Sequence, residues 1–259
     1  MGGHIPTRKT LRRGGGFVVT LLLTTSLLGF TWRDVPGSGA VQETLASAWQ
    51  SAINAARGPV RVGIQVGHEN AAAHPEELAR LRVNTGGHAN GLDEVDLNRA
   101  VAEALQAQLE AYGVVVELLS ATPPPDYYAD LVLSLHADSV EDPARRGYKS
   151  AYFEPERNPL EARLKAHIDR AYLAASNLPD DHHNTTRNMH RYYAFNARRY
   201  QHSVHPGTPA LIVEMGYLSS EADMAFLNLP EQPAAALSQG VVAFLQAQGR
   251  LPAELANVE

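Results

Sequence analysis

The stretch Leu131-Val132-Leu133-Ser134-Leu135-His136-Ala137-Asp138 decides the fold of this chain. Apolar and small residues run directly into a histidine and an acid, with no alternation of polar and apolar positions. Such a run predicts a strand that is buried on both faces of a sheet. Buried strands of α/β sheets end at clefts, so we expect His136 to face a ligand. The alternative is a histidine that caps the strand and bonds nearby backbone.

Strands and helices alternate along the rest of the chain, which indicates one α/β domain. Alternating apolar residues predict a strand over 60–67, and an apolar face with four-residue spacing predicts a helix after Asp93. We expect further strands over 114–119, 147–153 and 209–217, and further helices over 75–81, 159–175, 191–199 and 233–248, with another helix beginning at Ser220.

The N-terminal segment has the pattern of an export signal. Four basic residues within positions 8–13 precede an apolar run over 17–30, which is short for a membrane span and suits the core of a signal peptide. We expect residues 1–40 to be a signal peptide or, with the apolar run extended over 17–32, a membrane anchor. A buried core helix is the alternative. Residues 41–59 then form a linker or a loose helix, residues 60–250 the domain, and residues 251–259 a tail.

Composition excludes several classes of function. Lys and Arg number 22 and Asp and Glu number 28, a formal net charge of −6, so nucleic acid is not expected as a partner. Without residues 1–40 the chain keeps 17 basic and 27 acidic residues, a net charge of −10. There is no cysteine, which excludes cysteine nucleophiles, cysteine-ligated zinc and disulfides. Any metal or acid–base chemistry must come from carboxylates and the eleven histidines.

Four such residues stand at strand ends or at a helix start: His68, Glu94, His136 and Glu214. Two neutral imidazoles and one carboxylate are a sufficient set of ligands for a catalytic zinc ion. A buried carboxylate such as Glu214 is costly unless it is paired, protonated or close to a metal, and it can act as a general base. For each histidine a structural role is the alternative, and Glu94 also suits a helix N-terminus electrostatically. The ligands lack the short spacing of an HExxH motif, so spacing alone leaves the assembly open.

The chain resembles a known family in four blocks, which follow the same order between about Arg61 and Phe244. They are Gly67-His68, Asp93 to Asn98 (DEVDLN), Ser134 to Asp138 (SLHAD) and Pro209 to Ser219 (PALIVEMGYLS). These blocks are similar to the signatures of zinc-dependent N-acetylmuramoyl-L-alanine amidases, the peptidoglycan amidases of the AmiA, AmiC and CwlV type.

The resemblance implies a single α/β domain of the phosphorylase/hydrolase-like kind, with a mixed, mostly parallel sheet of about six strands between helices. It implies that His68, Glu94 and His136 hold Zn²⁺ and that Glu214 is the catalytic acid–base. The reaction implied is hydrolysis of the amide between the lactyl group of N-acetylmuramic acid and L-alanine. We expect such an enzyme to act as a monomer on peptidoglycan or muropeptides, exported to the bacterial cell envelope.

The chain departs from the family pattern at its first corner, where Gln65-Val66-Gly67-His68-Glu69-Asn70 replaces Asp-Pro-Gly-His-Gly-Gly. Gln65 can still orient His68 by a hydrogen bond, and Asp138 is expected to support the ligands similarly. The altered corner keeps two alternatives open: another zinc amidohydrolase or carboxypeptidase, and a non-catalytic wall-binding module.

Two further segments have no counterpart in the family pattern. His88 lies in a loop rich in glycine and asparagine, and it is either an extra ligand or an exposed histidine. The histidine-rich segment 182–205 is expected to present His182 and His183 on a solvated face. Arg187 and Arg191 suit a peptide carboxylate, with surface arginines as the alternative. The loop around His88 and this segment are the candidates for a movable lid.

Overall fold

The structure is a computed structural model that describes residues 38–142 and 144–253. Residues 1–37 of the signal peptide or anchor expected over 1–40, and the end of the tail, residues 254–259, lie outside the described residues. The chain divides into two compact units, Met1–Arg57 and Gly58–Glu259. In the first unit, helix α2 (Ser38–Arg57) covers most of the segment expected to be a linker or loose helix. No helix in the described part of the chain combines the length and the apolar character needed to cross a membrane.

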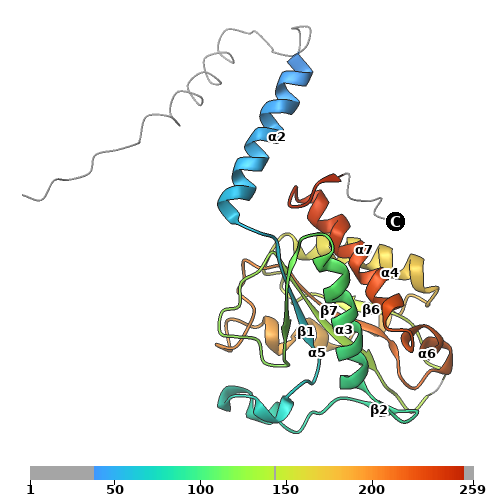
Figure 1. Ribbon diagram of the computed structural model, residues 1–259. Coiled ribbons are helices and arrows are strands. Elements are labelled where there is room, and N and C mark those ends of the chain that lie inside the picture. The colour runs from blue at the N-terminus through green and yellow to red at the C-terminus, as the bar shows by residue number, and fades with distance from the viewer. Residues whose placement is uncertain (1–37, 143, 254–259) are drawn as a thin grey trace, which may run out of the picture. The chain divides into compact units, whose positions relative to one another are not determined.

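The second unit is built on a five-stranded sheet with the order β4-β1-β5-β7-β6 (Figure 1). Strands β4, β1, β5 and β7 are parallel, and only β6 at the edge is antiparallel. The chain leaves β1 for β4 on one side and returns to β5 on the other, so a topological switch point lies between β1 and β5. The bounds are β1 (Arg61–Val66), β4 (Val115–Leu119), β5 (Leu131–Asp138), β6 (Lys149–Ala151) and β7 (Ala210–Tyr217).

Helices cover one face of the sheet (Figure 1). In β5, Leu131, Leu133, Leu135 and Ala137 all belong to the core on that side, because alternate residues of a strand point to the same face. The remaining helices are α3 (Glu94–Glu110), α4 (Glu161–Ser176), α5 (Arg187–His190), α6 (Glu221–Leu227), α7 (Glu231–Ala247) and the 3₁₀ helices η2 (Ala71–Ala73), η3 (Glu76–Leu81), η4 (His182–Asn184) and η5 (Tyr193–Phe195).

The opposite face of the sheet carries a smaller core, which includes Val132 of β5 and Ile212 of β7. Irregular chain between residues 187 and 204 covers this face and contributes Met189 and Phe195 to the core. In the alternation of β5, His136 falls on the same face as Val132. In β7, Glu214 falls on the same face as Ile212, so both polar residues face the irregular layer rather than the helices.

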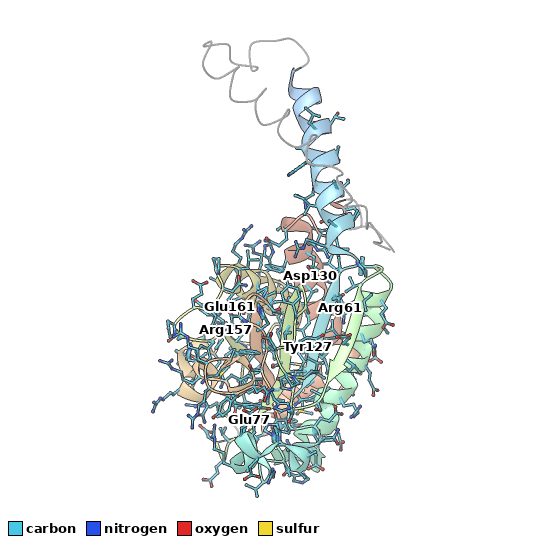
Figure 2. All side chains as sticks on the ribbon, turned by 90° about the vertical axis from the view of Figure 1, so that its left-hand side faces the viewer. Arg61, Glu77, Tyr127, Asp130, Arg157 and Glu161 are labelled. Atoms are coloured by element: carbon cyan, nitrogen blue, oxygen red, sulfur yellow. The ribbon has the colours of Figure 1, made fainter. Side chains whose placement is uncertain are left out.

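The amino ends of the strands are tied together by one arginine near the C-terminus. Arg250 is buried, and its guanidinium forms an ion pair with Asp130 at 2.9 Å and donates to the Gly58 carbonyl at 3.2 Å. The Asp130 carboxylate also accepts from the backbone N–H of Arg61 at 2.9 Å, at the start of β1 (Figure 2). The two ends of this unit therefore meet at one edge of the sheet.

The expected elements are largely confirmed, with two corrections. The sheet has the five strands expected from the sequence pattern rather than the about six implied by the resemblance, and β2 (His88–Ala89) and β3 (Leu92–Asp93) pair only with each other as a separate hairpin. The helix expected over 191–199 is wrong: α5 ends at His190, and η5 is a single 3₁₀ turn. The composition of that segment favoured a helix, but Tyr192 and Phe195 are instead used to cover the sheet.

Candidate functional site

The candidate residues converge at the carboxyl ends of β1, β5 and β7. His136 and Glu214 are register partners on neighbouring parallel strands, so their side chains leave the sheet side by side. His68 follows β1, and its ring centre lies 4.9 Å from that of His136. Glu94 is the first residue of α3, and its Oε1 lies 2.9 Å from Nδ1 of His136 and 3.3 Å from Nε2 of His68. The cluster thus lies at the switch point where open α/β sheets bind ligands.

The corner that carries His68 is tight. His68 has a φ of 64°, in the left-handed region that few non-glycine residues adopt. The preceding glycine lets the corner approach β5, because a Cβ on Gly67 would lie 2.5 Å from Cε1 of His136. The carbonyl of Asn84 accepts from Nδ1 of His68 at 3.0 Å. A proton fixed on Nδ1 leaves the Nε2 lone pair directed at the cluster.

Glu94 is held as a carboxylate by the groups around it. Its Oε2 accepts from the backbone N–H of Gly87 at 2.8 Å, and its Oε1 accepts from that of Ala137 at 3.3 Å. Burial alone would raise the pKa of Glu94, but the hydrogen bonds and charges of His136 and His68 outweigh burial and hold the pKa well below its usual value. The N-terminus of α3 favours the same ionised state.

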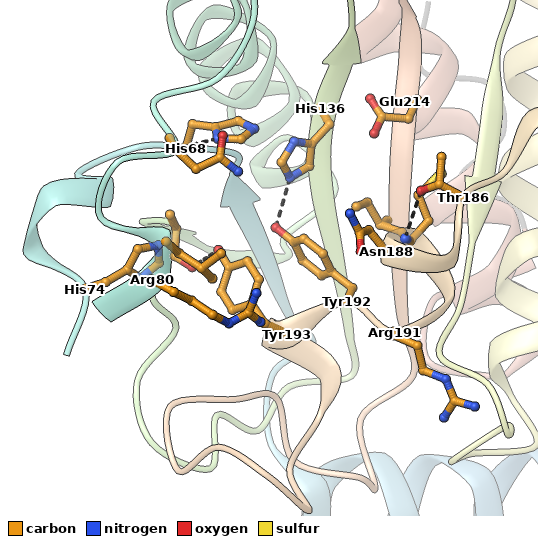
Figure 3. Close-up of a pocket in the computed structure, with 15 residues that line it drawn as sticks. His68, His74, Arg80, His136, Thr186, Asn188, Arg191, Tyr192, Tyr193 and Glu214 are labelled. Carbon is orange, nitrogen blue, oxygen red and sulfur yellow. Dashed lines mark hydrogen bonds between the residues drawn. The ribbon is translucent and has the colours of Figure 1, made fainter. Parts of the chain in front are cut away.

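His136 has a hydrogen-bond partner on each ring nitrogen. Nδ1 faces Glu94, and Nε2 lies 2.9 Å from the hydroxyl of Tyr192 (Figure 3). When Nε2 donates its proton to the Tyr192 oxygen, the lone pair of Nδ1 is free for a ligand. Tyr192 is buried and sits directly after α5, in the irregular layer. Sequence reasoning missed it, because nothing in its local pattern signals a contact with β5.

The residues present fit a metal ion. Two imidazoles and one carboxylate lie together, with the ligand atoms of His68, Glu94 and His136 within 4.8 Å of one another. This is a donor set typical of catalytic zinc. Each ligand is also oriented by a second contact, from Asn84, Gly87 or Tyr192 respectively, as is usual for metal-binding histidines and carboxylates.

Glu214 stands beside this cluster, and its surroundings displace its pKa. Burial, with the neighbouring charges of Asp138 and Glu94, raises the pKa of Glu214 well above its usual value, while Lys149 acts in the opposite direction. Lys149 is buried, lies opposite Glu214 in the β6–β7 register and forms an ion pair with Asp138. Asp138 therefore contributes charge near the acid–base candidate, and its side-chain contact is with Lys149.

Gln65 forms other hydrogen bonds than the one expected with His68. Its amide donates to the Ala121 carbonyl at 2.7 Å, and its Oε1 accepts from the Ser134 hydroxyl at 2.5 Å. Gln65 therefore ties β1 and β5 to the turn after β4, and the carbonyl of Asn84 takes the place expected for it beside His68. Glu69, at the same altered corner, is buried against Arg99.

Two cavities meet at the cluster. The main cavity, of about 280 Å³, is lined by His68, His136 and Glu214 and by residues of the 186–193 segment (Figure 3). The ligand-side hollow, of about 310 Å³, borders the same three residues and extends over Gly87 and Ser139. The two cavities therefore lie on either side of these three residues and share them as lining.

His88, His182 and His183 all lie outside the group of His68, Glu94 and His136. His88 is exposed and pairs with Asp93 at 2.7 Å, outside the ligand cluster. His183 is exposed, as expected for a solvated face, with 76% of its side chain accessible. The expectation is wrong for His182, which is partly buried and paired with Asp169 and Asp180.

The comparisons with known proteins were made for sequence and for structure. The sequence profile described as N-acetylmuramoyl-L-alanine amidase matches residues 62–243. No curated protein matches the chain. Among solved structures, the N-acetylmuramoyl-L-alanine amidase AmiC2 of Nostoc punctiforme is similar at 20% identity with a TM-score of 0.53, covering 73% of this chain and 98% of its own.

Two further amidase structures show the same fold. The catalytic domain of CwlV from Bacillus (Paenibacillus) polymyxa var. colistinus is 18% identical with a TM-score of 0.51, over 72% of this chain and 98% of its own. Ami1 from Mycobacterium abscessus, in its apo form, is 20% identical with a TM-score of 0.52, over 72% and 98% respectively. Because the family profile spans most of the chain and the fold agrees, the chain belongs to the N-acetylmuramoyl-L-alanine amidase family and is an enzyme of that class.

Proposed function

We propose that the chain is a zinc-dependent amidase of the cell envelope that hydrolyses the bond between N-acetylmuramic acid and L-alanine in peptidoglycan or muropeptides. The observation that carries the proposal is the convergence of His68, Glu94 and His136 beside Glu214, at the mouth of two cavities. Export of the chain, by a signal or anchor in residues 1–40, would bring the site to this substrate.

His68, Glu94 and His136 would hold the metal. When bound, zinc supplies a Lewis acid that polarises a carbonyl and makes water a competent nucleophile at neutral pH. Glu214 in its ionised form accepts the proton of the attacking water and then delivers it to the nitrogen of the leaving L-alanine. A raised pKa suits both steps, because it makes the carboxylate a stronger base toward the water and lets the protonated acid persist until the proton is delivered. No serine or cysteine nucleophile is required.

The deciding experiment combines metal analysis with product analysis. The full-length protein is purified, its zinc content is measured, and it is incubated with peptidoglycan and with N-acetylmuramoyl peptides. We expect about one zinc per chain, since the described residues contain one three-ligand site. We also expect new L-alanine amino termini together with unsubstituted N-acetylmuramic acid.

Other products identify the competing functions. Cleavage between two amino acids, with the lactyl amide left intact, identifies a zinc carboxypeptidase or another amidohydrolase on this fold. Sedimentation with peptidoglycan that is accompanied by no cleavage identifies a wall-binding module. A chain that binds no zinc contradicts the proposal directly.

A further inference from the structure

A third hollow adjoins the main cavity on the side of Arg191. The arginine hollow, of about 350 Å³, is lined by Phe153, Phe195, Arg157, Arg191 and Arg198 among others. Arg191 also lines the main cavity, so these two spaces share a wall. The main cavity in turn shares His136 with the ligand-side hollow. The three spaces therefore follow one another, with the ligand cluster between the first two and the arginine hollow at one end.

The charged residues that line the ligand-side hollow differ in sign from those that line the arginine hollow. Among its lining residues the ligand-side hollow has three acids, Glu94, Asp138 and Glu214, and no lysine or arginine. The arginine hollow has three arginines and a single acid, Glu156. The chain as a whole is acidic, with a net charge of −6, so this local excess of positive charge is contrary to the general composition. A substrate with one anionic end would bind in a single direction.

Two of the three arginines are available to a ligand. Arg157 forms an ion pair with Glu161, which is fully buried (Figure 2). Within the described parts of the chain, Arg191 and Arg198 lie within ion-pair distance of no acid, and both are exposed. Figure 3 shows Arg191 extending away from His68 and His136. A carboxylate in this hollow would therefore meet unpaired guanidinium groups, which bind carboxylates in a bidentate manner.

The hollow also has a rigid floor connected to the ligand cluster. The Arg157 guanidinium lies 5.4 Å from the ring centre of Phe195, and that of Arg191 lies 5.6 Å from the ring centre of Phe153. Both phenylalanine rings are buried. The ring of Phe195 packs edge-on against Tyr192 at 5.1 Å, and Tyr192 contacts His136. The floor of the hollow and the metal ligand are thus fixed by the same packed segment.

We infer that the arginine hollow is a subsite for a carboxylate of the substrate peptide, recognised by Arg191 and Arg198. The inference rests on the proposed function. The muramic acid residue of the substrate is uncharged at its lactyl group, because that carboxyl is part of the amide, whereas the peptide carries free carboxylates. The peptide therefore extends through the main cavity toward Arg191 and Arg198. The glycan side occupies the ligand-side hollow, over Gly87 and Ser139.

The test uses two substrates that differ only in charge. One is N-acetylmuramoyl-L-alanyl-D-isoglutamyl-L-lysine with both carboxylates free, and the other is the same compound with both converted to carboxamides. The full-length enzyme should hydrolyse the free acid with a KM about 10-fold lower than that of the bis-carboxamide, the effect expected of a charged hydrogen bond at a solvent-accessible site. This preference should shrink as NaCl is raised, because salt screens exposed charges.

The variant for this test is the double change Arg191→Gln and Arg198→Gln. It should raise KM for the free acid about 10-fold and leave kcat within about twofold, with no effect on the bis-carboxamide. The control is Arg199→Gln, which removes one positive charge next to Arg198, from a side chain that lies over the ring of Tyr200 at 5.2 Å. The control should keep the preference. Thermal unfolding of each variant checks that the fold is retained.

The inference fails if the double variant still prefers the free acid as strongly as the unchanged enzyme, or if it loses activity on both substrates equally. Failure of the proposed function is a different result, because the unchanged enzyme then hydrolyses neither compound. The subsite can still be tested in that case by calorimetric binding of the peptide L-alanyl-D-isoglutamyl-L-lysine. Binding that is retained in the double variant contradicts the subsite, and binding lost only in the double variant supports it.

Discussion

Two clusters of histidine and carboxylate occur in this molecule, and they are built in opposite ways. In the ligand cluster, one carboxylate, Glu94, is shared by two rings, His68 and His136. In the His182 cluster, one ring lies between two carboxylates, Asp180 at 2.5 Å and Asp169 at 3.3 Å. In the first arrangement one nitrogen of each ring faces the same carboxylate beside the cavities, whereas in the second the two nitrogens of one ring face two different carboxylates.

The surroundings of the two clusters reinforce the difference. Asp169 accepts from the hydroxyls of Ser150 and Tyr148 and pairs with Lys165, so its oxygens are fully used. In the part of the chain that the structure describes, only His68, Glu94 and His136 form a group that can hold a metal ion. A histidine-rich sequence therefore says little about metal binding until the direction of the lone pairs is known. The comparison predicts that changes in one cluster affect chemistry and changes in the other affect stability.

The largest expected effect is on turnover. Glu214→Gln keeps the shape of the side chain but removes the proton acceptor, so kcat should fall about 1,000-fold, within the range for loss of a general base. Zinc content should be unchanged, as measured by atomic absorption. Asp169→Asn, the corresponding change in the His182 cluster, should leave kcat within about twofold. A Glu214→Gln enzyme of normal activity would remove the acid–base assignment.

The next effect is on metal affinity. His136→Ala removes a ligand, so zinc affinity measured by competition with a chelator should fall by more than about 100-fold, beyond the usual effect of a residue that only contacts a ligand. His182→Ala should leave the affinity unchanged. Equal losses in the two variants would show that the clusters do not differ as described.

A smaller effect is expected from the residue behind His136. Tyr192→Phe keeps the ring that packs on Phe195 but removes the hydroxyl 2.9 Å from Nε2. Zinc affinity should fall about 10-fold, because ligand orientation is lost while the ligands remain. The same competition assay measures this change. An unchanged affinity would mean that ring packing alone orients His136.

The smallest effect is a pH-dependent loss of stability in the His182 cluster. Burial lowers the pKa of His182, but the hydrogen bond and charge of Asp169 outweigh burial and raise the pKa above 6.5. A raised pKa in the folded state means that the ion pairs stabilise the fold fully below pH 6.5 and lose that contribution as the pH rises through the folded value. His182→Gln should therefore lower the free energy of unfolding by about 0.5–1 kcal/mol at low pH and by much less at high pH.

Urea unfolding at about pH 5.5 and about pH 8.5, on either side of the ordinary histidine pKa, measures this difference. The matched control is His183→Gln, whose side chain is 76% exposed and lies 3.7 Å from Asp181. The control should show little change at either pH. A loss of stability that is larger at high pH would contradict the assignment of charge to His182.

The sequence predicts the ligand cluster well because its members are tied to regular elements. His136 ends an apolar strand, Glu94 begins an amphipathic helix and Glu214 interrupts a buried strand, and such positions converge at one edge of a parallel sheet. The resemblance in the four family blocks also implies that these residues belong to one site. The two-residue strands β2 and β3 lie in a stretch rich in glycine and asparagine, where no regular pattern predicts them.

The contacts around the ligands could not be predicted in the same way. Asn84 acts through a backbone carbonyl, which any residue supplies, and Tyr192 lies in a segment without periodicity, 56 positions from His136. Gln65 is expected to orient His68 by a hydrogen bond, but its amide donates to the Ala121 carbonyl in the turn after β4. Loop conformation decides these contacts, and hydrophobic patterns carry little information about it.

The ion pair of Arg250 with Asp130 and its hydrogen bond to Gly58 determine where this domain can be attached to a linker, a surface or another protein. Residue 58 enters the domain at the amino edge of the sheet, and the cleft opens at the carboxyl edge, about 20 Å away for a strand of six residues. The chain leaves the domain at the same amino edge. A linker, a surface or a fusion partner attached near residue 58 or residue 250 would hold the domain at the amino edge of its sheet. The cleft at the carboxyl edge would then stay accessible to a polymer that is too large to diffuse.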